Sequence, residues 1–215
     1  MLYLPPDAEN KQEKSAVNWP ERFQELAKTA KHPALKRYYE VGIASADTSI
    51  DNVPMVAVDF ETTGMNPDKH GIISIAVVPM TLSRIDMSKA QQWVVKPRRL
   101  LTEESVTIHG ITHSEIEQAP DLADVIEPLL EAVSGKVWVV HYNGIERPFL
   151  QGAFKERLNE SILFPVIDTM EIEARFHRQK RSLWDKLTGK KPVSIRLADS
   201  RERYNLPFYA PHDAM

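Results

Sequence analysis

The stretch VAVDFETTG, residues 56–64, places two carboxylates at the end of an otherwise apolar run. Alternate residues of a β-strand point to the same side, so Asp59 and Glu61 should share one face while Phe60 points to the other. Two like charges held this close repel each other, and a divalent cation or an Arg or Lys side chain usually relieves the repulsion. The chain has no cysteine, so a metal ion bound here would have oxygen or imidazole ligands.

Two later segments carry groups suited to the same chemistry. In HYNGIERPFL, Glu146 stands in the first turn of an expected helix, although the spacing of Asn143 and Glu146 also suits a helix capping box. In LPFYAPHDAM, His212 follows a short loop. Carboxylates and a histidine at the ends of strands and helices suit metal-assisted attack on a phosphate, with the imidazole accepting a proton.

The hydrophobic pattern predicts the elements that must position these residues. Helical spacing at residues 19–39, interrupted at Pro33, predicts two short helices, and residues 45–52 form a polar link. Later residues predict strands at 56–60, 72–80, 91–95, 137–140 and 164–167, and helices at 121–133, 145–158 and from 169 onward. This order predicts an α/β fold with a mixed sheet, whose carboxyl edge is the usual place for a ligand site.

Composition restricts the class of protein. The 215 residues suit one domain with an extension, and no apolar run is long enough to span a bilayer. A net charge of -3 argues against a protein that coats duplex nucleic acid. Residues 175–191 are basic and include Trp184, which fits either a solvated surface or a nucleic-acid contact. The absence of cysteine and of an export signal fits the cytoplasm.

Several other residues have simpler interpretations. His109 and His113 are spaced as in some zinc sites, but Gly110 breaks a helix and no Glu occupies the position that a zinc-protease motif requires. We therefore expect no zinc there. His141 and Asp168 end predicted strands, and either lining the site or a structural role would suit them. The tryptophans expected to pack in the core are Trp19, Trp93 and Trp138.

Four motifs, VDFETTG, IHGIT, HYNGIERPFL and PHDAM, occur in an order that resembles the DEDDh (DnaQ-like) 3'-to-5' exonucleases. This superfamily includes the epsilon proofreading subunit of bacterial DNA polymerase III. The ordered set is far more specific than any single motif. The resemblance implies a ribonuclease H-like α/β fold, with a mixed five-stranded sheet flanked by helices. Residues 53–215 would form the exonuclease domain, and residues 1–52 a polar N-terminus and a helical extension.

The same resemblance implies the site and the reaction. Two Mg²⁺ or Mn²⁺ ions would be held by Asp59, Glu61 and Glu146, with His212 as the general base. The terminal nucleotide would lie beside Thr62, Thr63, His109 and Thr112. The implied reaction releases nucleoside 5'-monophosphates from single-stranded or frayed 3' ends of DNA or RNA, and a DNA polymerase is the candidate partner.

Two departures from the family pattern leave a rival interpretation open. Glu146 stands where the family carries the shorter Asp. The family's last carboxylate comes five residues after the histidine, whereas this sequence ends three residues after His212, so we expect it to stop short of its final metal ligand. The rival is a catalytically degenerate exonuclease-fold module that binds nucleic acid or a partner protein.

Overall fold

A mixed β-sheet forms the centre of the computed structural model, which describes residues 17–98, 111–178 and 192–207, without the side chains of His113 and Arg178. Strand β1 (Met55–Thr62) is antiparallel to β2 (Ile72–Thr81) and parallel to β5 (Val137–Val140). Beyond β5 lies the parallel strand β6 (Val166–Asp168). The short strands β3 (Arg84–Ile85) and β4 (Gln91–Val94) pair with different parts of the other edge of β2. Six strands therefore occupy five positions, as the family resemblance implies.

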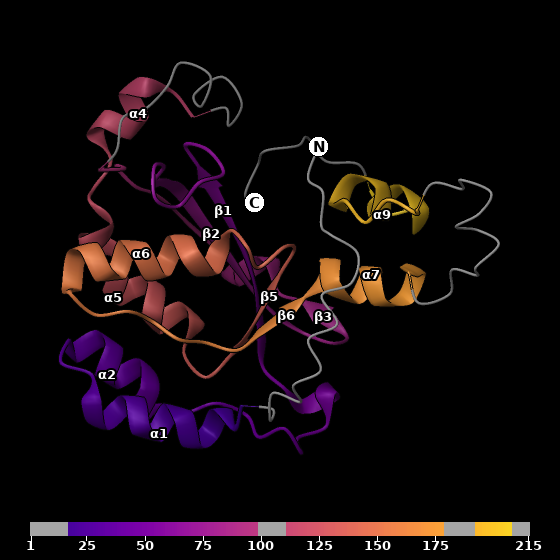
Figure 1. The fold of residues 1–215 in the computed structure, drawn as a ribbon, viewed down its shortest axis with the longest axis horizontal. Coiled ribbons are helices and arrows are strands. Elements are labelled where there is room, and N and C mark those ends of the chain that lie inside the picture. Colours follow the sequence, from indigo (N-terminus) through magenta and orange to yellow (C-terminus); the bar gives the residue numbers. More distant parts are fainter. Residues whose placement is uncertain (1–16, 99–110, 179–191, 208–215) are drawn as a thin grey trace.

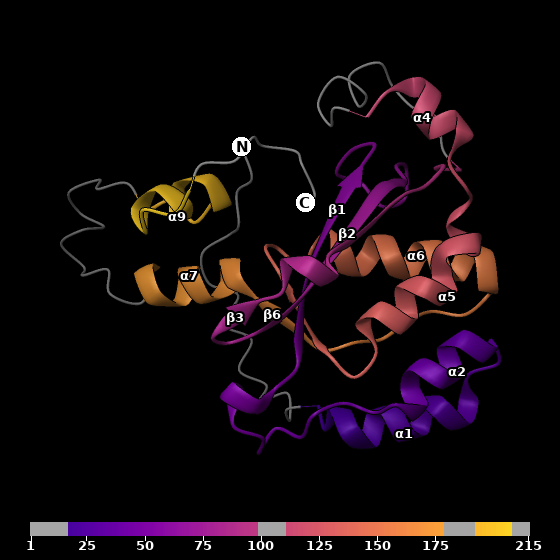
Figure 2. The ribbon, with the colours of Figure 1, turned by 180° about the vertical axis from the view of Figure 1, so that it is seen from behind.

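Helices cover both sides of this sheet (Figure 1). Helices α5 (Leu122–Val133) and α6 (Glu146–Leu158) lie to the left of the sheet in Figure 1, and α7 (Thr169–Arg178) and α9 (Leu197–Arg203) lie to its right. Figure 2 shows the same arrangement from behind. The remaining short elements are α4 (His113–Gln118) and the 3-10 helices η1 (Ile50–Asn52) and η2 (Met87–Lys89). No helix among the described residues is long and apolar enough to cross a bilayer.

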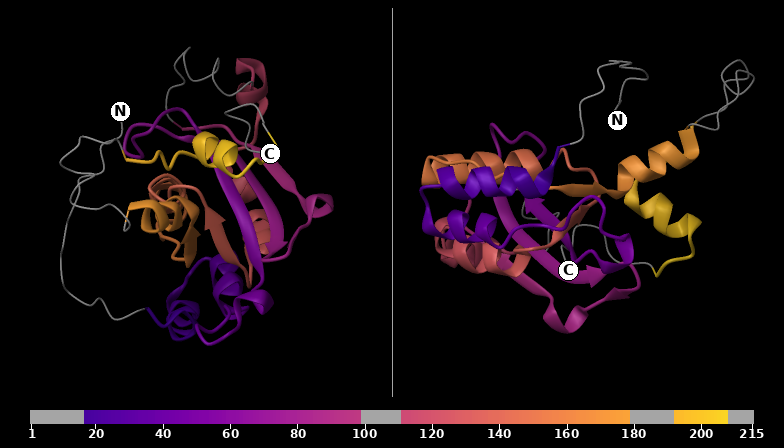
Figure 3. Two further views of the ribbon diagram at one scale, coloured as in Figure 1. Left: turned by 90° about the vertical axis from the view of Figure 1, so that its right-hand side faces the viewer. Right: turned by 90° about the horizontal axis from the view of Figure 1, so that it is seen from below.

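The N-terminal helices α1 (Trp19–Thr29) and α2 (Pro33–Glu40) lie beside α5 (Figures 1 and 3). Phe23 is fully buried in the same apolar cluster as Trp138 of β5. The Glu160 carboxylate accepts hydrogen bonds from the backbone N–H groups of Lys31 (2.8 Å) and His32 (2.7 Å), which lie at the start of α2. The helical extension therefore completes the core of the sheet domain rather than forming a separate unit.

The sequence pattern identified the principal elements. The strand at 137–140 is confirmed at both ends, and the two N-terminal helices separate at Pro33 as predicted. The tryptophans pack in or against the core as expected. The alternative interpretation of Asn143 and Glu146 as a capping box is wrong, because the N-cap of α6 is Ile145 and no side chain caps this helix. Among the described residues, the predictions omitted five short elements: β3, α4, α9 and the 3-10 helices η1 and η2.

Candidate active site

Three parallel strands of the sheet end at one edge, and the candidate site lies there. The ends of β1, β5 and β6 meet at this edge because neighbouring parallel strands point the same way. Ala57 of β1 pairs with Val139 of β5, so β1 extends past the end of β5 and Asp59 stands level with His141. Helix α6 begins at Glu146, directly after this edge, and contacts β1.

Strand alternation brings Asp59 and Glu61 to one face, as predicted. Val58 and Phe60 point into the core from the other face. Asp59 is exposed at the strand end, whereas Glu61 is buried. Opposite Glu61 on β2 stands Ser74, and one extra residue in β2 follows this pair and interrupts the register. This irregularity interrupts the pairing of β2 with β1 directly beside Glu61.

Glu146 is the most deeply buried acidic residue of the site. Only 2% of its surface is exposed, and Oε2 has no hydrogen-bond partner among the described residues. Burial raises the pKa of Glu146 to about 8; its own backbone N–H opposes this rise, while the Asp59 and Asp168 carboxylates add to it. A buried carboxylate oxygen without a donor is costly, so this position favours the arrival of a proton or a cation.

The pKa of Asp59 is raised as well, although this residue stands at the rim of the site. Surrounding protein atoms displace part of its hydration and, together with the neighbouring Glu61 carboxylate, raise the pKa of Asp59 to about 7, against the Phe60 backbone N–H. Asp59 thus interacts with Glu61 along its strand and with Glu146 across the site. The structure therefore places Asp59 near each of the other two acidic residues predicted from the sequence, in two pairs rather than as one group of three.

The carboxylates of this site offer oxygen ligands of the kind that a hard divalent cation prefers. Within the described ranges, no three His, Cys, Asp or Glu side chains are grouped so as to bind one ion. The donors available are the Asp59–Glu61 and Asp59–Glu146 pairs and the unpartnered Oε2 of Glu146. Mg²⁺ is commonly bound by one or two carboxylates, with water and substrate phosphate completing its shell. The donor set therefore suits a divalent cation whose remaining ligands are supplied by water or phosphate oxygens.

Thr62 and Thr63 shape the loop that follows β1. The Thr62 hydroxyl donates to the carbonyl of Gly64 (2.9 Å), and the Thr63 hydroxyl accepts from the N–H of Gly71 (3.0 Å). Gly64 has a φ of 155°, and a Cβ there would lie 2.7 Å from the His70 ring. Glycine is required at this turn because the ring packs directly on its backbone. Contact of either threonine with a nucleotide stays a prediction.

The exonuclease family RNase_T matches residues 56–215, which include every residue of this site. The chain belongs to the RNase_T exonuclease family. Helices α1 and α2 precede the matched residues.

Two curated polymerase proteins are similar to this exonuclease domain. The PolC-type DNA polymerase III of Bacillus subtilis is 31% identical over 129 residues, covering 60% of this chain and 9% of that protein. The DNA polymerase III subunit epsilon of Pasteurella multocida is 26% identical over 140 residues, covering 61% of this chain and 55% of that protein. The chain therefore spans less than two thirds of either relative.

Solved exonuclease structures share the fold. E. coli Exonuclease I in complex with a dT13 oligonucleotide has a TM-score of 0.62 at 17% identity, covering 76% of this chain and 38% of that one. Cell-death related nuclease 4 (CRN-4) has a TM-score of 0.57 at 22% identity, covering 75% of this chain and 58% of that one. These likenesses confirm the fold class predicted from the motifs.

The remaining predicted residues of this exonuclease domain have different outcomes. His109 and His212 lie outside the described residues, as does most of the basic segment 175–191. Thr112 is the N-cap of α4: its hydroxyl donates to the Glu115 carboxylate (2.7 Å) and accepts from the Glu115 N–H (3.3 Å). The role of Thr112 beside a nucleotide stays a prediction, since its observed contacts are those of a capping box.

Asp168 and His141 make structural contacts at the edge of the site. A structural role was one of the two roles that the sequence suggested for these residues. The Asp168 carboxylate accepts backbone hydrogen bonds from Tyr142 (3.0 Å) and Asn143 (2.9 Å). Nδ1 of His141 lies 2.9 Å from the Thr169 hydroxyl, which donates to the carbonyl of Val140 (3.0 Å). The sequence could not assign these contacts, because they join residues 25 to 29 positions apart.

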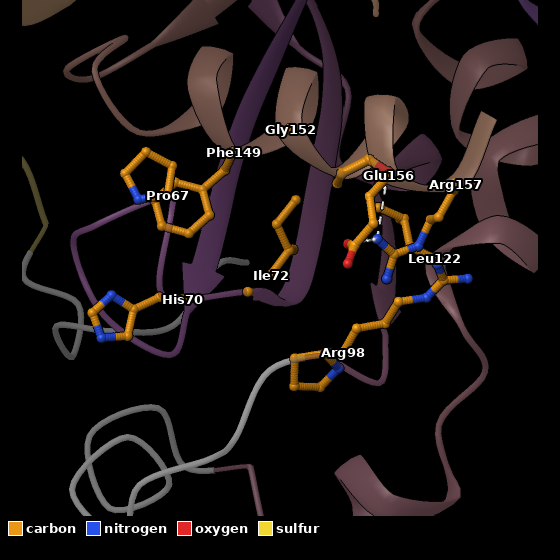
Figure 4. Close-up of a pocket in the computed structure, with 12 residues that line it drawn as sticks. Pro67, His70, Ile72, Arg98, Leu122, Phe149, Gly152, Glu156 and Arg157 are labelled. Atoms are coloured by element: carbon orange, nitrogen blue, oxygen red, sulfur yellow. Dashed lines mark hydrogen bonds and ion pairs between the residues drawn. The ribbon is translucent and has the colours of Figure 1, made fainter. Parts of the chain in front are cut away.

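A small cavity lies along α6, beyond the first turn that carries Glu146 (Figure 4). Its lining includes Phe149 and Gly152 of α6, Pro67 and His70 of the loop after β1, and Arg98. The volume is about 30 Å³, far below the several hundred Å³ of a typical ligand pocket. This cavity is therefore too small to hold a nucleotide.

Proposed function

We propose that this domain is a metal-dependent 3'-to-5' exonuclease that releases nucleoside 5'-monophosphates from DNA ends. The observation that carries the proposal is the unpartnered Glu146 Oε2, buried beside the Asp59 carboxylate at the carboxyl edge of the sheet. Such an arrangement is unfavourable without a cation and becomes favourable when one binds between the carboxylates. Membership of an exonuclease family supports a phosphodiester as the bond that is cleaved.

In this proposal each residue has a defined task. Asp59, Glu61 and Glu146 would hold Mg²⁺ or Mn²⁺, and the chemistry that such ions supply is stabilisation of charge on phosphate oxygens. His212 would accept the proton of the attacking water, a task that suits an imidazole near neutral pH. The loop fixed by Thr62 and Thr63 would orient the terminal nucleotide.

Single-stranded or frayed 3' ends are the proposed substrate, because a terminal nucleotide must leave its partner to reach the sheet edge. The single-stranded oligonucleotide in the similar Exonuclease I structure supports this choice. A DNA polymerase is the proposed partner, by analogy with the polymerase III proteins that this chain resembles. The analogy covers only the shared exonuclease domain.

The test compares nucleotide release by the protein at its natural length and by two variants. Wild-type protein with Mn²⁺ should shorten a 5'-labelled single strand stepwise and should release the label of a 3'-labelled strand as a mononucleotide. Asp59→Ala should lower kcat more than about 100-fold, because a ligand is lost. Asp124→Ala, an exposed carboxylate on α5, is the matched control and should leave the rate unchanged. Equal rates for wild type and Asp59→Ala would contradict the proposal.

The rival function is nucleic-acid or partner binding by a catalytically degenerate domain. The longer Glu146 side chain is the observation that favours it, because the resembling family carries Asp at this position. Calorimetric titration with Mn²⁺ separates the two. Binding that disappears in both Asp59→Ala and Glu146→Ala supports the enzyme, whereas oligonucleotide binding without any Mn²⁺ binding supports the rival.

A further inference from the structure

The turn between β5 and α6 has an unusual backbone conformation two to four residues before Glu146. Tyr142 has a φ of 85°, a value that is rare for residues with a Cβ. Its carbonyl accepts a hydrogen bond from the Ile145 N–H (3.2 Å), so the turn leads directly into the first residues of α6. An outlier of this kind persists only where the surrounding structure holds it in place.

The Asp168 side chain holds this turn. One carboxylate oxygen, Oδ1, accepts from the Tyr142 N–H (3.0 Å) and the other, Oδ2, from the Asn143 N–H (2.9 Å). Oδ1 also accepts from the N–H of Met170 (2.9 Å) at the start of α7. Hydrogen bonds from N–H groups to a carboxylate are stronger than those to a neutral acceptor. Asp168 thus joins the turn to the β6–α7 junction, and both of its oxygens are engaged by backbone donors.

The Tyr142 ring also packs against this turn. A Cβ on Gly144 would lie 2.7 Å from Cζ of Tyr142, so the ring packs on the Gly144 backbone. The residues after Gly144 continue into α6 and present Glu146 to Asp59. The position of the Glu146 side chain therefore depends on how firmly this turn is held.

We propose that Asp168 and Tyr142 are positioning residues, a clamp that holds the turn so that the Glu146 carboxylate stays beside Asp59 for metal binding. The inference rests on the proposed metal-dependent function. A Glu has one more rotatable bond than an Asp, so its carboxylate is placed less rigidly by the backbone alone. Restraining the backbone on both sides of Gly144 compensates for that freedom.

Two variants test the clamp by different means. Asp168→Asn keeps the size of the side chain but removes its charge and one acceptor oxygen. Tyr142→Gly removes the ring and permits a positive φ without a Cβ. Both should weaken Mn²⁺ binding at least tenfold in calorimetry and should lower kcat with little change in KM. Tyr142→Gly should do so with an unchanged or higher melting temperature, an outcome that a merely structural role would not produce.

Matched controls come from elsewhere in the fold. Asn159→Gly relieves another positive φ (54°) at the other end of α6, and Mn²⁺ affinity should stay unchanged. Asp121→Asn can still cap α5 but loses the ion pairs with Arg157 and Arg98, so it should lower the melting temperature without changing Mn²⁺ affinity. If Asp168→Asn does not fold, Tyr142→Gly decides. Wild-type Mn²⁺ affinity in Tyr142→Gly overturns the proposal.

A second readout separates failure of the clamp from failure of the proposed function. The amides of Ile145 and Arg147 donate to the carbonyls of Tyr142 and Asn143, so their hydrogen exchange reports on the turn without metal. If wild-type protein binds no Mn²⁺, the proposed function fails and this exchange decides on the clamp. Exchange at least tenfold faster in Asp168→Asn supports the clamp, and unchanged exchange overturns it.

Discussion

At the scale of single residues, Asp59 and Glu146 occupy positions where the ionised form of a carboxyl group is unfavourable. Glu146 is buried with Oε2 lacking a partner among the described residues, and the Asp59 carboxylate lies close enough to raise its pKa further. An apolar or neutral residue would serve stability better at this position. Stability given up at a site of this kind is typical of residues retained for binding or catalysis.

The first prediction replaces that buried carboxyl group. Glu146→Gln keeps the shape of the side chain and allows its amide to donate to Asp59, so the free energy of unfolding without metal should rise by about 1 to 2 kcal/mol. Mn²⁺ binding and nucleotide release should be lost. Urea unfolding and calorimetry measure the two effects, with Glu131→Gln, an exposed residue of α5, as the control. Lower stability together with intact Mn²⁺ binding would contradict a metal role for Glu146.

At the scale of elements, Asp121 links the start of α5 to the end of α6. Its carboxylate caps α5 by accepting from the Ala123 N–H (2.8 Å) and pairs with Arg157 (2.8 Å) and Arg98 (2.9 Å). The Arg157 side chain is only 5% exposed, and its charge is paired with Asp121 and with Glu156 (3.1 Å). Partial burial opposes ionisation of Asp121, but the Ala123 N–H and the two guanidinium groups outweigh it and lower the pKa of Asp121 to about 2.

The second prediction follows from that pKa. Because folding lowers the pKa of Asp121, its contribution is fully present above the ordinary Asp pKa of about 4 and is lost as the pH falls toward 2. Allowing for partial exposure to solvent, the contribution is about 1 to 2 kcal/mol. Asp121→Asn should therefore be less stable than wild type at pH 6 and nearly equal at pH 2. Urea unfolding at both values measures this, and a difference that does not change with pH would argue against the ion pairs.

Elements with a strong hydrophobic period were predictable from the sequence. The same period predicted which residues of a strand or helix share a face. Strand alternation was sufficient to put Asp59 and Glu61 on one face. Helix α4 was missed because six residues are too few for a clear helical period, although Thr112 and Glu115 carried a capping-box signal. The role of Asp168 could not be predicted, since it depends on the pairing of β5 with β6.

At the scale of the whole molecule, the exonuclease domain and its N-terminal helices share one core. The family match begins at residue 56, yet Phe23, Leu35 and Tyr38 from α1 and α2 are buried in the cluster that contains Trp138. Tyr38 and Trp138 are among the largest fully buried side chains of the described residues. Packing of this kind makes the helices a structural part of the domain, because their removal would expose the apolar surface beneath them.

The last prediction tests this shared core. Phe23→Ala removes a fully buried ring that contacts Tyr38 and Tyr39, with ring centroids 5.4 and 5.2 Å away. The free energy of unfolding should fall by about 3 to 5 kcal/mol, the usual cost of such a cavity. If the helices and the sheet unfold together, urea curves followed by tryptophan fluorescence and by far-ultraviolet circular dichroism should coincide in both proteins. Lys28→Ala, on the exposed face of α1, should change stability by less than about 0.5 kcal/mol. Two separate transitions, with only the first shifted by Phe23→Ala, would instead mean that α1 and α2 unfold independently and that the sheet is stable without them.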